Sequence, residues 1–190
     1  MASIILPDRS FVKYVDYLQK QNAEELAFYP LRALEEALDK RRIITIEENG
    51  ETAGYLWHGA MWLDRPIVIY QACIDYDLRR QHLGFALVNQ LIEVSKAYGA
   101  PGIRCRVASS TESNRFWQAI GFYCFDVTPG GVKRKRDINH YRLDFDNLDQ
   151  GHIIIPSSKA TDLRSYNRDK SSGVEMPSRF SRSHYGGSGE

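Results

Sequence analysis

Residues 81–86 carry side chains at a spacing that could bind an anion. Gln81 and the two arginines before it supply donors and positive charge, while Gly84 and Ala86 leave the backbone open to a ligand. The apolar repeat that follows predicts a helix from about Leu83, where the first amides lack an intrahelical partner and the helix dipole is positive. This combination favours a phosphate-binding turn. The alternative is an ordinary helix start beside two solvated arginines.

Other kinds of chemistry lack a supporting motif. The segment has neither the glycines of the Gly-x-Gly-x-x-Gly dinucleotide fingerprint nor the Gly-Lys-Ser/Thr of a P-loop. The sequence also lacks a serine–histidine–aspartate pattern and a Cys/His metal spacing. The cysteines lie in apolar stretches, which predicts reduced core thiols rather than a disulfide frame or a metal site. They are Cys73, Cys105 and Cys124. We therefore expect no metal cofactor.

The phosphate turn needs a strand before it and a helix behind it, and the apolar periodicity predicts both. The preceding strand, IVIYQACI, is too continuously apolar to face solvent, so we expect it at the centre of a sheet. Asn49-Gly50 is a two-residue turn signal and predicts a β-hairpin. The expected order is strand 3–6, helix 10–21, helix 30–40, hairpin 42–62, strand 65–74, helix 83–98, strand 103–107, helix 111–120, and strands 122–127 and 140–145. This order predicts an α/β or α+β fold with helices packed on a sheet.

The first two helices carry local signals of their own. Ser10 is an N-cap candidate for the first. Pro30 suits the first turn of the second, and the apolar stripe expected on that helix consists of Leu31, Leu34 and Leu38.

The phosphate turn resembles the signature of a known family, the GNAT superfamily of acyl-CoA-dependent N-acyltransferases. That signature is Gln/Arg-x-x-Gly-x-Gly/Ala, and Gln81-His82-Leu83-Gly84-Phe85-Ala86 matches it at every specified position. The segment NRFWQAIGF resembles the aromatic-x-x-x-Gly-Phe end of the family's fourth helix. The resemblance covers about residues 3–145. It implies a mixed central sheet of about six to seven strands, flanked by about four helices and splayed at a cofactor cleft.

The resemblance divides the chain into a GNAT acyltransferase domain at residues 1–145 and a C-terminal tail at 146–190. In the tail the periodicity disappears and serine, glycine and scattered charges dominate. We expect this tail to be mostly disordered or to dock on a partner. The apolar run at the N-terminus is far too short for a signal peptide, and no segment approaches a membrane span. These features predict a cytoplasmic protein.

The resemblance also implies that acetyl-CoA, or another acyl-CoA, is the co-substrate. Backbone amides of the turn would hold its pyrophosphate, with Gln81 at the opening position. Backbone groups of the central strand would pair with the pantetheine arm. Asn114 is a further candidate, although Ser110 occupies the family's usual spacing. The implied cofactor-binding residues are Ala72, Ile74, Gln81, His82, Leu83, Gly84, Phe85, Ala86 and Asn114.

The family's usual acid and base positions are altered in this chain. The central strand has no carboxylate, and Trp117 stands where many members have a tyrosine that protonates the thiolate. The candidate catalytic residues are Tyr70, Asp75 and Tyr141, and His58 is a further option. Each also has a structural interpretation, such as a packed aromatic or a turn cap. Alternatively, the acceptor needs little help from a base, as for an α-amino group with a pKa of about 7.7 or a neutral nucleobase amine.

The implied function is transfer of an acetyl or short acyl group to an amine, directly and within a ternary complex. One alternative is a nucleobase-modifying enzyme of the phage Mom type. The basic loop Lys133, Arg134, Lys135 and Arg136 could hold a nucleic-acid backbone or an acidic acceptor, or could simply be a solvated hairpin tip. The net charge of +1 gives no general affinity for polyanions. A second alternative is a GNAT domain that binds acyl-CoA without turnover.

Overall fold

The computed structural model describes residues 2–131 and 135–146. Within these ranges the elements follow the predicted order, including the hairpin, whose turn residues Asn49 and Gly50 have φ of 54° and 81°. The elements are β1 (Ser3–Ile5), η1 (Arg9–Phe11), α1 (Val12–Gln21), α2 (Leu31–Asp39), β2 (Ile43–Glu48), β3 (Glu51–His58), β4 (Ile67–Ile74), η2 (Tyr76–Leu78), α3 (Leu83–Tyr98), β5 (Gly102–Ala108), α4 (Ser113–Ala119), β6 (Tyr123–Thr128) and β7 (Ile138–Asp144), where η marks a 3-10 helix.

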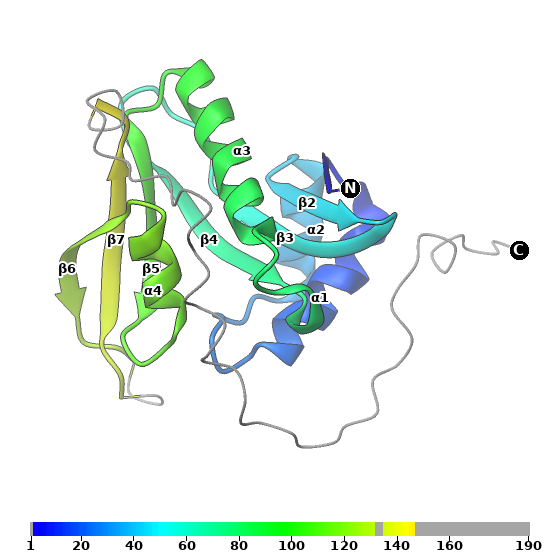
Figure 1. Cartoon of the computed structure of the whole chain (residues 1–190), viewed down its shortest axis with the longest axis horizontal. Helices are drawn as coiled ribbons and strands as arrows, with labels where there is room; N and C mark the ends of the chain where they lie inside the picture. The colour runs from blue at the N-terminus through cyan, green and yellow to red at the C-terminus, as the bar shows by residue number, and fades with distance from the viewer. Residues whose placement is uncertain (1, 132–134, 147–190) are drawn as a thin grey trace, which may run out of the picture.

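A single sheet of seven strands runs through the described part of the chain in the order β1-β2-β3-β4-β5-β7-β6. β4 and β5 pair in parallel, and the other neighbouring strands pair antiparallel. α3 and α4 lie on one face of the sheet, and α1 and α2 lie on the other (Figure 1). β4 occupies the central place that its apolar sequence predicts. The mixed sheet flanked by helices confirms the predicted fold class.

The two faces of the sheet bury separate apolar clusters. The cluster beneath α3 includes Leu87 and Ile103 and extends to Trp117 of α4. The cluster beneath α1 and α2 includes Leu34 and Tyr55. Burial of each large apolar side chain contributes about 1.5–3 kcal/mol to folding. The strands at the centre of the sheet, β3 and β4, contribute residues to both clusters and are held from both sides.

Two signals in the first helices were wrong in detail. Ser10 does not cap α1, which has no side-chain cap, because the chain already turns into η1 at Arg9. Asp8 caps η1, and its carboxylate accepts a hydrogen bond from the Ser10 amide at 2.8 Å. Leu31 is 45% exposed, since it is the first residue of α2 and lies beyond the edge of the core. The buried stripe of α2 consists of Leu34, Ala37 and Leu38.

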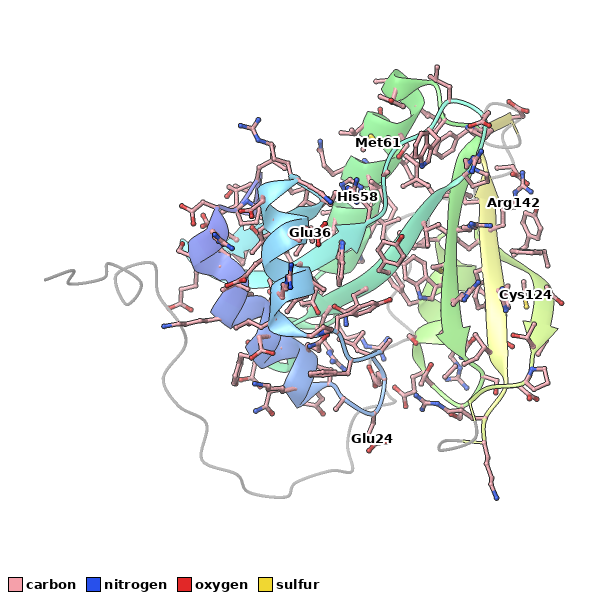
Figure 2. All side chains as sticks on the ribbon, turned by 180° about the vertical axis from the view of Figure 1, so that it is seen from behind. Glu24, Glu36, His58, Met61, Cys124 and Arg142 are labelled. Carbon is pink, nitrogen blue, oxygen red and sulfur yellow. The ribbon has the colours of Figure 1, made fainter. Side chains whose placement is uncertain are left out.

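No described helix or loop covers the half of the sheet formed by β5, β7 and β6 on the face that α1 and α2 occupy elsewhere (Figure 2). β6 is the edge strand, and its residues are exposed except for the half-buried Thr128. Cys124 lies on this strand and is exposed. The prediction of buried thiols therefore holds for Cys73 and Cys105 but was wrong for Cys124, because an edge strand beside an uncovered face buries little.

Candidate active site

The parallel strands β4 and β5 separate partway along their length. Residues 67–69 of β4 pair with residues 103–105 of β5, and pairing between the two strands ends there. β5 instead continues alongside β7 over its full length. The two strands therefore diverge and leave a gap in the middle of the sheet (Figure 1). This is the splay that the family resemblance implies at the cofactor cleft.

A β-bulge lies where the gap begins. Trp57 of β3 pairs with Gln71, and His58 pairs with Ile69, so Tyr70 is the extra residue on β4. A bulge interrupts regular pairing and redirects the side chain that it carries. Tyr70 is 44% exposed, whereas its neighbours Ile69 and Gln71 are buried. The expectation that this strand is shielded along its whole length was therefore wrong at Tyr70.

Beyond the bulge, β4 directs backbone groups into the gap. The Asp75 amide donates to the carbonyl of Ala53 on β3 at 2.8 Å. Backbone groups alternate in direction along a strand, so those of Ala72 and Ile74 are directed away from β3, toward the side where β5 has separated. The Ile74 carbonyl accepts a hydrogen bond from Nε of Arg79 at 3.2 Å. Ala72 and the Ile74 amide thus form a short backbone edge along the gap.

The turn between β4 and α3 contains two left-handed residues. Arg80 and His82 have φ of 65° and 61°, a conformation that costs a non-glycine residue about 1–2 kcal/mol. Such residues turn successive amides toward one side, as in an anion-binding nest. The amides of residues 83–85 precede the first helical hydrogen bond, which the Ala86 amide donates to the His82 carbonyl at 3.0 Å. The Ala86 amide, expected to bind phosphate, is therefore occupied within the helix.

Gly84 keeps the start of α3 open toward α4 and the end of β4. A Cβ at this position would lie 3.4 Å from the Phe116 ring and 3.7 Å from Cγ1 of Ile74. Leu83, which is 4% exposed, fixes the start of the helix in the core. The helix start, the end of β4 and the first turn of α4 therefore approach one another closely. A long side chain at Gly84 would fill the space between them.

The two arginines before the turn interact with neighbouring loops. Arg79 donates to Oδ1 of Asn22 at 2.5 Å and lies 3.9 Å from Glu25, both in the α1–α2 loop. Nη2 of Arg80 lies 3.9 Å from Oε2 of Glu112, in the β5–α4 loop. Gln81 is exposed at the opening of the turn. The turn is thereby connected to both of the loops that border the gap.

Two of the acid–base candidates have structural roles. Asp75 caps η2 by accepting a hydrogen bond from the Asp77 amide at 3.3 Å. His58 is 5% exposed, and its Nδ1 donates to the Gly59 carbonyl at 2.8 Å. Desolvation lowers the pKa of His58, although the hydrogen bond to Gly59 opposes this. Turn capping by Asp75 was one of the interpretations that the sequence left open; its pairing with Arg79 or Arg80 does not occur.

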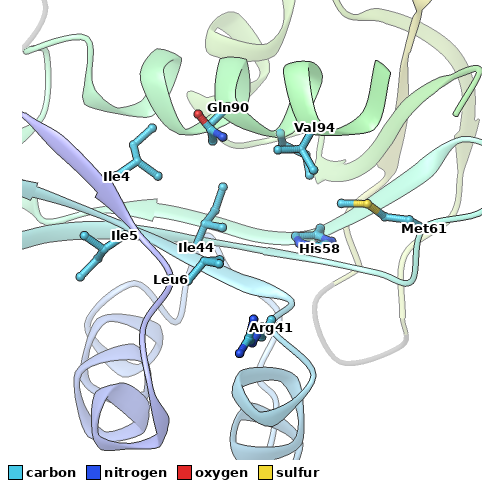
Figure 3. Close-up of a pocket in the computed structure, with 10 residues that line it drawn as sticks. Ile4, Ile5, Leu6, Arg41, Ile44, His58, Met61, Gln90 and Val94 are labelled. Carbon is cyan, nitrogen blue, oxygen red and sulfur yellow. The ribbon is translucent and has the colours of Figure 1, made fainter. Parts of the chain in front are cut away.

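His58 also lines a cavity of about 310 Å³. This cavity lies between β1, β2, the end of β3 and the middle of α3, whose Gln90 and Val94 project toward the strands (Figure 3). Its walls are mainly apolar and include Ile44 and Met61. None of the residues that line it borders the gap between β4 and β5. The cavity is therefore separate from the candidate active site.

Asn114 and Tyr141 belong to one hydrogen-bond network between α4 and β7. Nδ2 of Asn114 donates to the carbonyls of Ala108 and Thr111 at 2.8 and 2.7 Å. Its Oδ1 accepts from Nδ2 of Asn139 at 2.8 Å and from the Tyr141 hydroxyl at 3.2 Å. Tyr141 is 1% exposed, and burial raises the pKa of its hydroxyl. Their polar atoms are thus occupied or enclosed by the protein, and the roles of Asn114 in cofactor binding and of Tyr141 in catalysis stay predictions.

On the α1–α2 face of the sheet, Tyr70 belongs to an aromatic cluster with Trp57 and Tyr29. The ring centroids of Tyr70 and Trp57 are 5.3 Å apart, and those of Trp57 and Tyr29 are 4.6 Å apart. Tyr29 lies in the α1–α2 loop. The pKa of its hydroxyl is raised by burial and by the proximity of Tyr70, and the positive charge of Arg106 partly opposes the rise. The cluster forms an aromatic wall on the side of the gap opposite α3.

A buried network of amides holds the α1–α2 loop against this wall. The Tyr55 hydroxyl donates to Oε1 of Gln71 at 2.9 Å. Nε2 of Gln71 donates to Oε1 of Gln19 at 2.9 Å and to the Ala27 carbonyl at 2.5 Å. Gln19 in turn bonds the backbone amide and carbonyl of Tyr29, each at 2.8 Å. No sequence motif predicts this hydrogen-bond network, because Gln19 and Gln71 are 52 residues apart.

The basic loop before β7 is described only in part. Lys133 and Arg134 lie outside the described residues. Lys135 is exposed and has φ of 43°. A Cβ at Gly130 would lie 1.8 Å from the carbonyl oxygen of Arg136, so this close approach requires glycine. Contact between the basic loop and a nucleic acid therefore stays a prediction.

The C-terminal tail, apart from Asp146, also lies outside the described residues, so its role stays a prediction too. Among the residues that are described, no three His, Cys, Asp or Glu side chains come together in a group that could hold a metal ion. No helix in the same part of the chain combines the length and apolar character needed to cross a membrane.

Solved structures from several organisms share this fold. Ard1 from Thermoplasma volcanium has a TM-score of 0.67 at 14% identity, covering 75% of this chain and 97% of its own. NAA60 from Arabidopsis thaliana, solved with a bisubstrate analogue, has a TM-score of 0.66 at 12% identity, covering 76% and 98%. The ribosomal-protein-S18-alanine N-acetyltransferase of Escherichia coli has a TM-score of 0.64 at 16% identity, covering 76% and 94%. At these identities the likeness shows the fold alone.

A comparison with family profiles identifies the family to which the chain belongs. No curated protein sequence gives a significant match. The profile described as "Acetyltransferase (GNAT) family" matches residues 10–122, which is more than half of the chain and includes the splayed strands, the turn and α4. The chain therefore belongs to the GNAT acetyltransferase family, whose enzymes transfer acyl groups.

Proposed function

We propose that the protein transfers an acetyl group from acetyl-CoA to an amine acceptor, directly and within a ternary complex. The observation that carries this proposal is the gap between β4 and β5, which runs from the Tyr70 bulge to the open start of α3. Cofactor and acceptor would approach from opposite faces of the sheet and meet at the bulge. Holding both reactants there converts a two-molecule encounter into a reaction between oriented neighbours.

On the α3 side, the proposal assigns the pyrophosphate of CoA to the amides of residues 83–85. Each hydrogen bond from such an amide to a charged oxygen contributes about 1.5–3 kcal/mol, and the helix dipole adds to it. The pantetheine arm would then follow β4, pairing with the backbone of Ala72 and the amide of Ile74 as an added strand does. Gly84 leaves room for this path beside Phe116. The thioester would end near Tyr70.

The chemistry requires a neutral amine that attacks the thioester carbonyl, after which the amine loses a proton and CoA departs as a thiolate. β4 offers no carboxylate, and Asp75 is occupied as a turn cap. A lysine side chain with a pKa of about 10.4 would pay roughly 4–5 kcal/mol to react as the free base at neutral pH, whereas an α-amino group with a pKa of about 7.7 needs little. We therefore assign the acceptor to easily deprotonated amines, with Tyr70 as the candidate polar side chain at the bulge.

The departing group also needs limited assistance. A thiol with an ordinary pKa of about 8.5 leaves readily as a thiolate, so the tyrosine that many family members use as an acid is dispensable for this class of reaction. Trp117 occupies that position in the core, with its ring centroid 5.1 Å from that of Phe116 and 5.0 Å from that of Phe122. In this proposal Trp117 stabilises the α3 side of the gap by packing and takes no part in proton transfer.

Two measurements test the proposal. In calorimetry the full chain should bind CoA with micromolar affinity, and adenosine, which lacks the pyrophosphate, should bind at least about 100-fold more weakly. In a thiol-release assay with acetyl-CoA, at least one member of a panel of peptide and small-molecule amines should increase the rate above that of hydrolysis. Absence of heat with CoA, together with no amine-dependent thiol release, would contradict it. Binding without release by any amine would support the non-catalytic alternative.

A further inference from the structure

Arg106 is the first residue of β5 beyond the point where β4 separates from it. The last pair between the two strands joins Ile69 and Cys105, and on its other side Arg106 pairs with His140 of β7. Cys105 is buried in the cluster beneath α3. Side chains alternate along a strand, so Arg106 presents its guanidinium to the opposite face, the face of α1 and α2. Arg106 therefore stands across the gap from Tyr70.

Arg106 lies near aromatic side chains and has no ion-pair partner among the described residues. Its positive charge acts on the hydroxyl of Tyr29, whose ring centroid is 6.3 Å from that of Tyr70. Arg104 lies two residues earlier on the same face and is likewise exposed. Within residues 2–131 and 135–146, neither arginine forms an ion pair, whereas Arg142 on the neighbouring strand pairs with Asp144. In the part of the chain that the structure describes, the acceptor side of the gap thus carries two arginines without an ion-pair partner.

We propose that Arg106 selects acceptors that carry a carboxylate close to the reacting amine, of which α-amino acids are the simplest class. The guanidinium is planar and binds a carboxylate through two parallel hydrogen bonds, which fixes the orientation of the acceptor as well as its position. The rings of Tyr29 and Tyr70 line the space beside it. This inference rests on the acyl transfer proposed above and names its acceptor.

The same contact eases deprotonation of the acceptor. In a free amino acid the carboxylate stabilises the neighbouring ammonium and keeps its pKa above that of a peptide α-amino group. Pairing with Arg106 neutralises the negative charge of the carboxylate and removes this stabilisation. The guanidinium also repels the ammonium directly, which favours the neutral amine. Both effects lower the pKa of the bound amine. Arg106 thereby promotes deprotonation of the acceptor amine through its charge. A basic side chain on β4 would promote it by accepting the proton.

The test compares acceptors with and without the carboxylate, and it follows how their ratio changes between variants, because the carboxylate also raises the pKa of the free amine. Thiol release from acetyl-CoA is measured with L-alanine and L-alaninamide, and with L-phenylalanine and its amide, for the unaltered chain, Arg106→Gln and Arg106→Lys. Arg65→Gln is the matched control, because Arg65 is exposed in the β3–β4 loop and packs over Trp62. For the unaltered chain and the control, kcat/KM should favour the carboxylate by at least about tenfold. Arg106→Gln should bring that ratio near one, and Arg106→Lys should restore part of it.

A second readout does not depend on turnover. With CoA present, calorimetry should show N-acetyl-L-alanine binding at least about tenfold more tightly than N-acetyl-L-alaninamide, and Arg106→Gln should abolish the difference. Equal binding of the two products, or an equal kcat/KM ratio in Arg106→Gln and the unaltered chain, would overturn the role of Arg106 while leaving acyl transfer intact. Failure of CoA itself to bind would instead overturn the proposed function.

Discussion

The two sides of the β4–β5 gap are built from different parts of the polypeptide. The α3 side consists of backbone amides at a helix start, a backbone edge at Ala72 and a glycine that leaves space. The α1–α2 side consists of side chains: three aromatic rings, a network of buried amides, and an arginine that has no ion pair among the described residues. The α3 side suits a ligand that all members of the family share, such as CoA. The α1–α2 side suits an acceptor that differs from one enzyme to another.

This difference has a physical basis. Every residue except proline carries the same backbone donor, so a backbone site depends on conformation and space, and it is damaged mainly by adding bulk or strain. A side-chain site depends on the chemical groups present, and it is damaged by removing them. The variants below separate these two modes of failure.

The largest effect is expected where bulk is added on the backbone side. Gly84→Leu should lower the affinity for CoA by more than about 100-fold, because the new side chain would fill the space between Phe116 and Ile74. Gly84→Ala is the matched control, since its Cβ would make an ordinary contact 3.4 Å from Phe116. Calorimetry measures both variants. Equal affinities of the leucine variant and the unaltered chain would show that CoA does not pass this position.

The second-largest effect is expected when the side-chain amide of Gln71 is removed on the α1–α2 side of the gap. Gln71→Leu would leave partners such as Tyr55 and Gln19 with unsatisfied buried groups, which should lower the free energy of unfolding by about 2–3 kcal/mol. Because the α1–α2 loop loses its support, KM for the acceptor should rise more than KM for acetyl-CoA. Urea denaturation and steady-state kinetics measure the two effects.

Thr45→Val is the control for that variant. The Thr45 hydroxyl is buried and has no hydrogen-bond partner among the described residues, so its removal should leave the free energy of unfolding nearly unchanged or slightly higher. If Gln71→Leu raises both KM values equally, the loop does not belong to the acceptor side alone.

A smaller effect is expected from the hydroxyl at the bulge. If the acceptor arrives as an easily deprotonated amine, Tyr70→Phe should lower kcat by less than about tenfold, because the ring contacts with Trp57 and Tyr29 remain. Tyr70→Ala, which also removes those contacts, should lower kcat further. A loss of 100-fold or more in the phenylalanine variant, with unchanged stability, would instead assign proton transfer to Tyr70.

The smallest effect concerns strain in the phosphate turn. His82 has φ of 61°, which glycine adopts more readily than other residues. His82→Gly should therefore be more stable than His82→Ala by about 0.5–1 kcal/mol, and comparing the two variants holds the loss of the imidazole constant. Thermal and urea unfolding measure the difference. A more stable alanine variant would show that the left-handed conformation is not retained.

The backbone side was largely predictable from sequence, and the side-chain side was not. The Gln81 to Ala86 spacing, the apolar strand before it and the helix behind it all predict a turn with open amides, and only the occupied amide of Ala86 departs from that expectation. Tyr70 was identified as polar, but the bulge that exposes it depends on pairing with β3. No sequence pattern indicated that Gln19, Gln71 and Arg106 belong to the site. Their contacts come from segments distant in the chain, and glutamine and arginine are common residue types.

The sequence by itself therefore determined the order of elements, the central place of β4, the turn at the start of α3 and the family. These are local or periodic properties: a repeat of apolar residues, a glycine at a fixed offset, a turn pair such as Asn49-Gly50. Only the tertiary structure decided that Asp75 caps a turn, that Tyr141 is enclosed, and that Arg106 and Tyr70 lie on opposite sides of a gap between two strands. Each of these features depends on packing between segments that are distant in the sequence. A local sequence pattern therefore does not predict them.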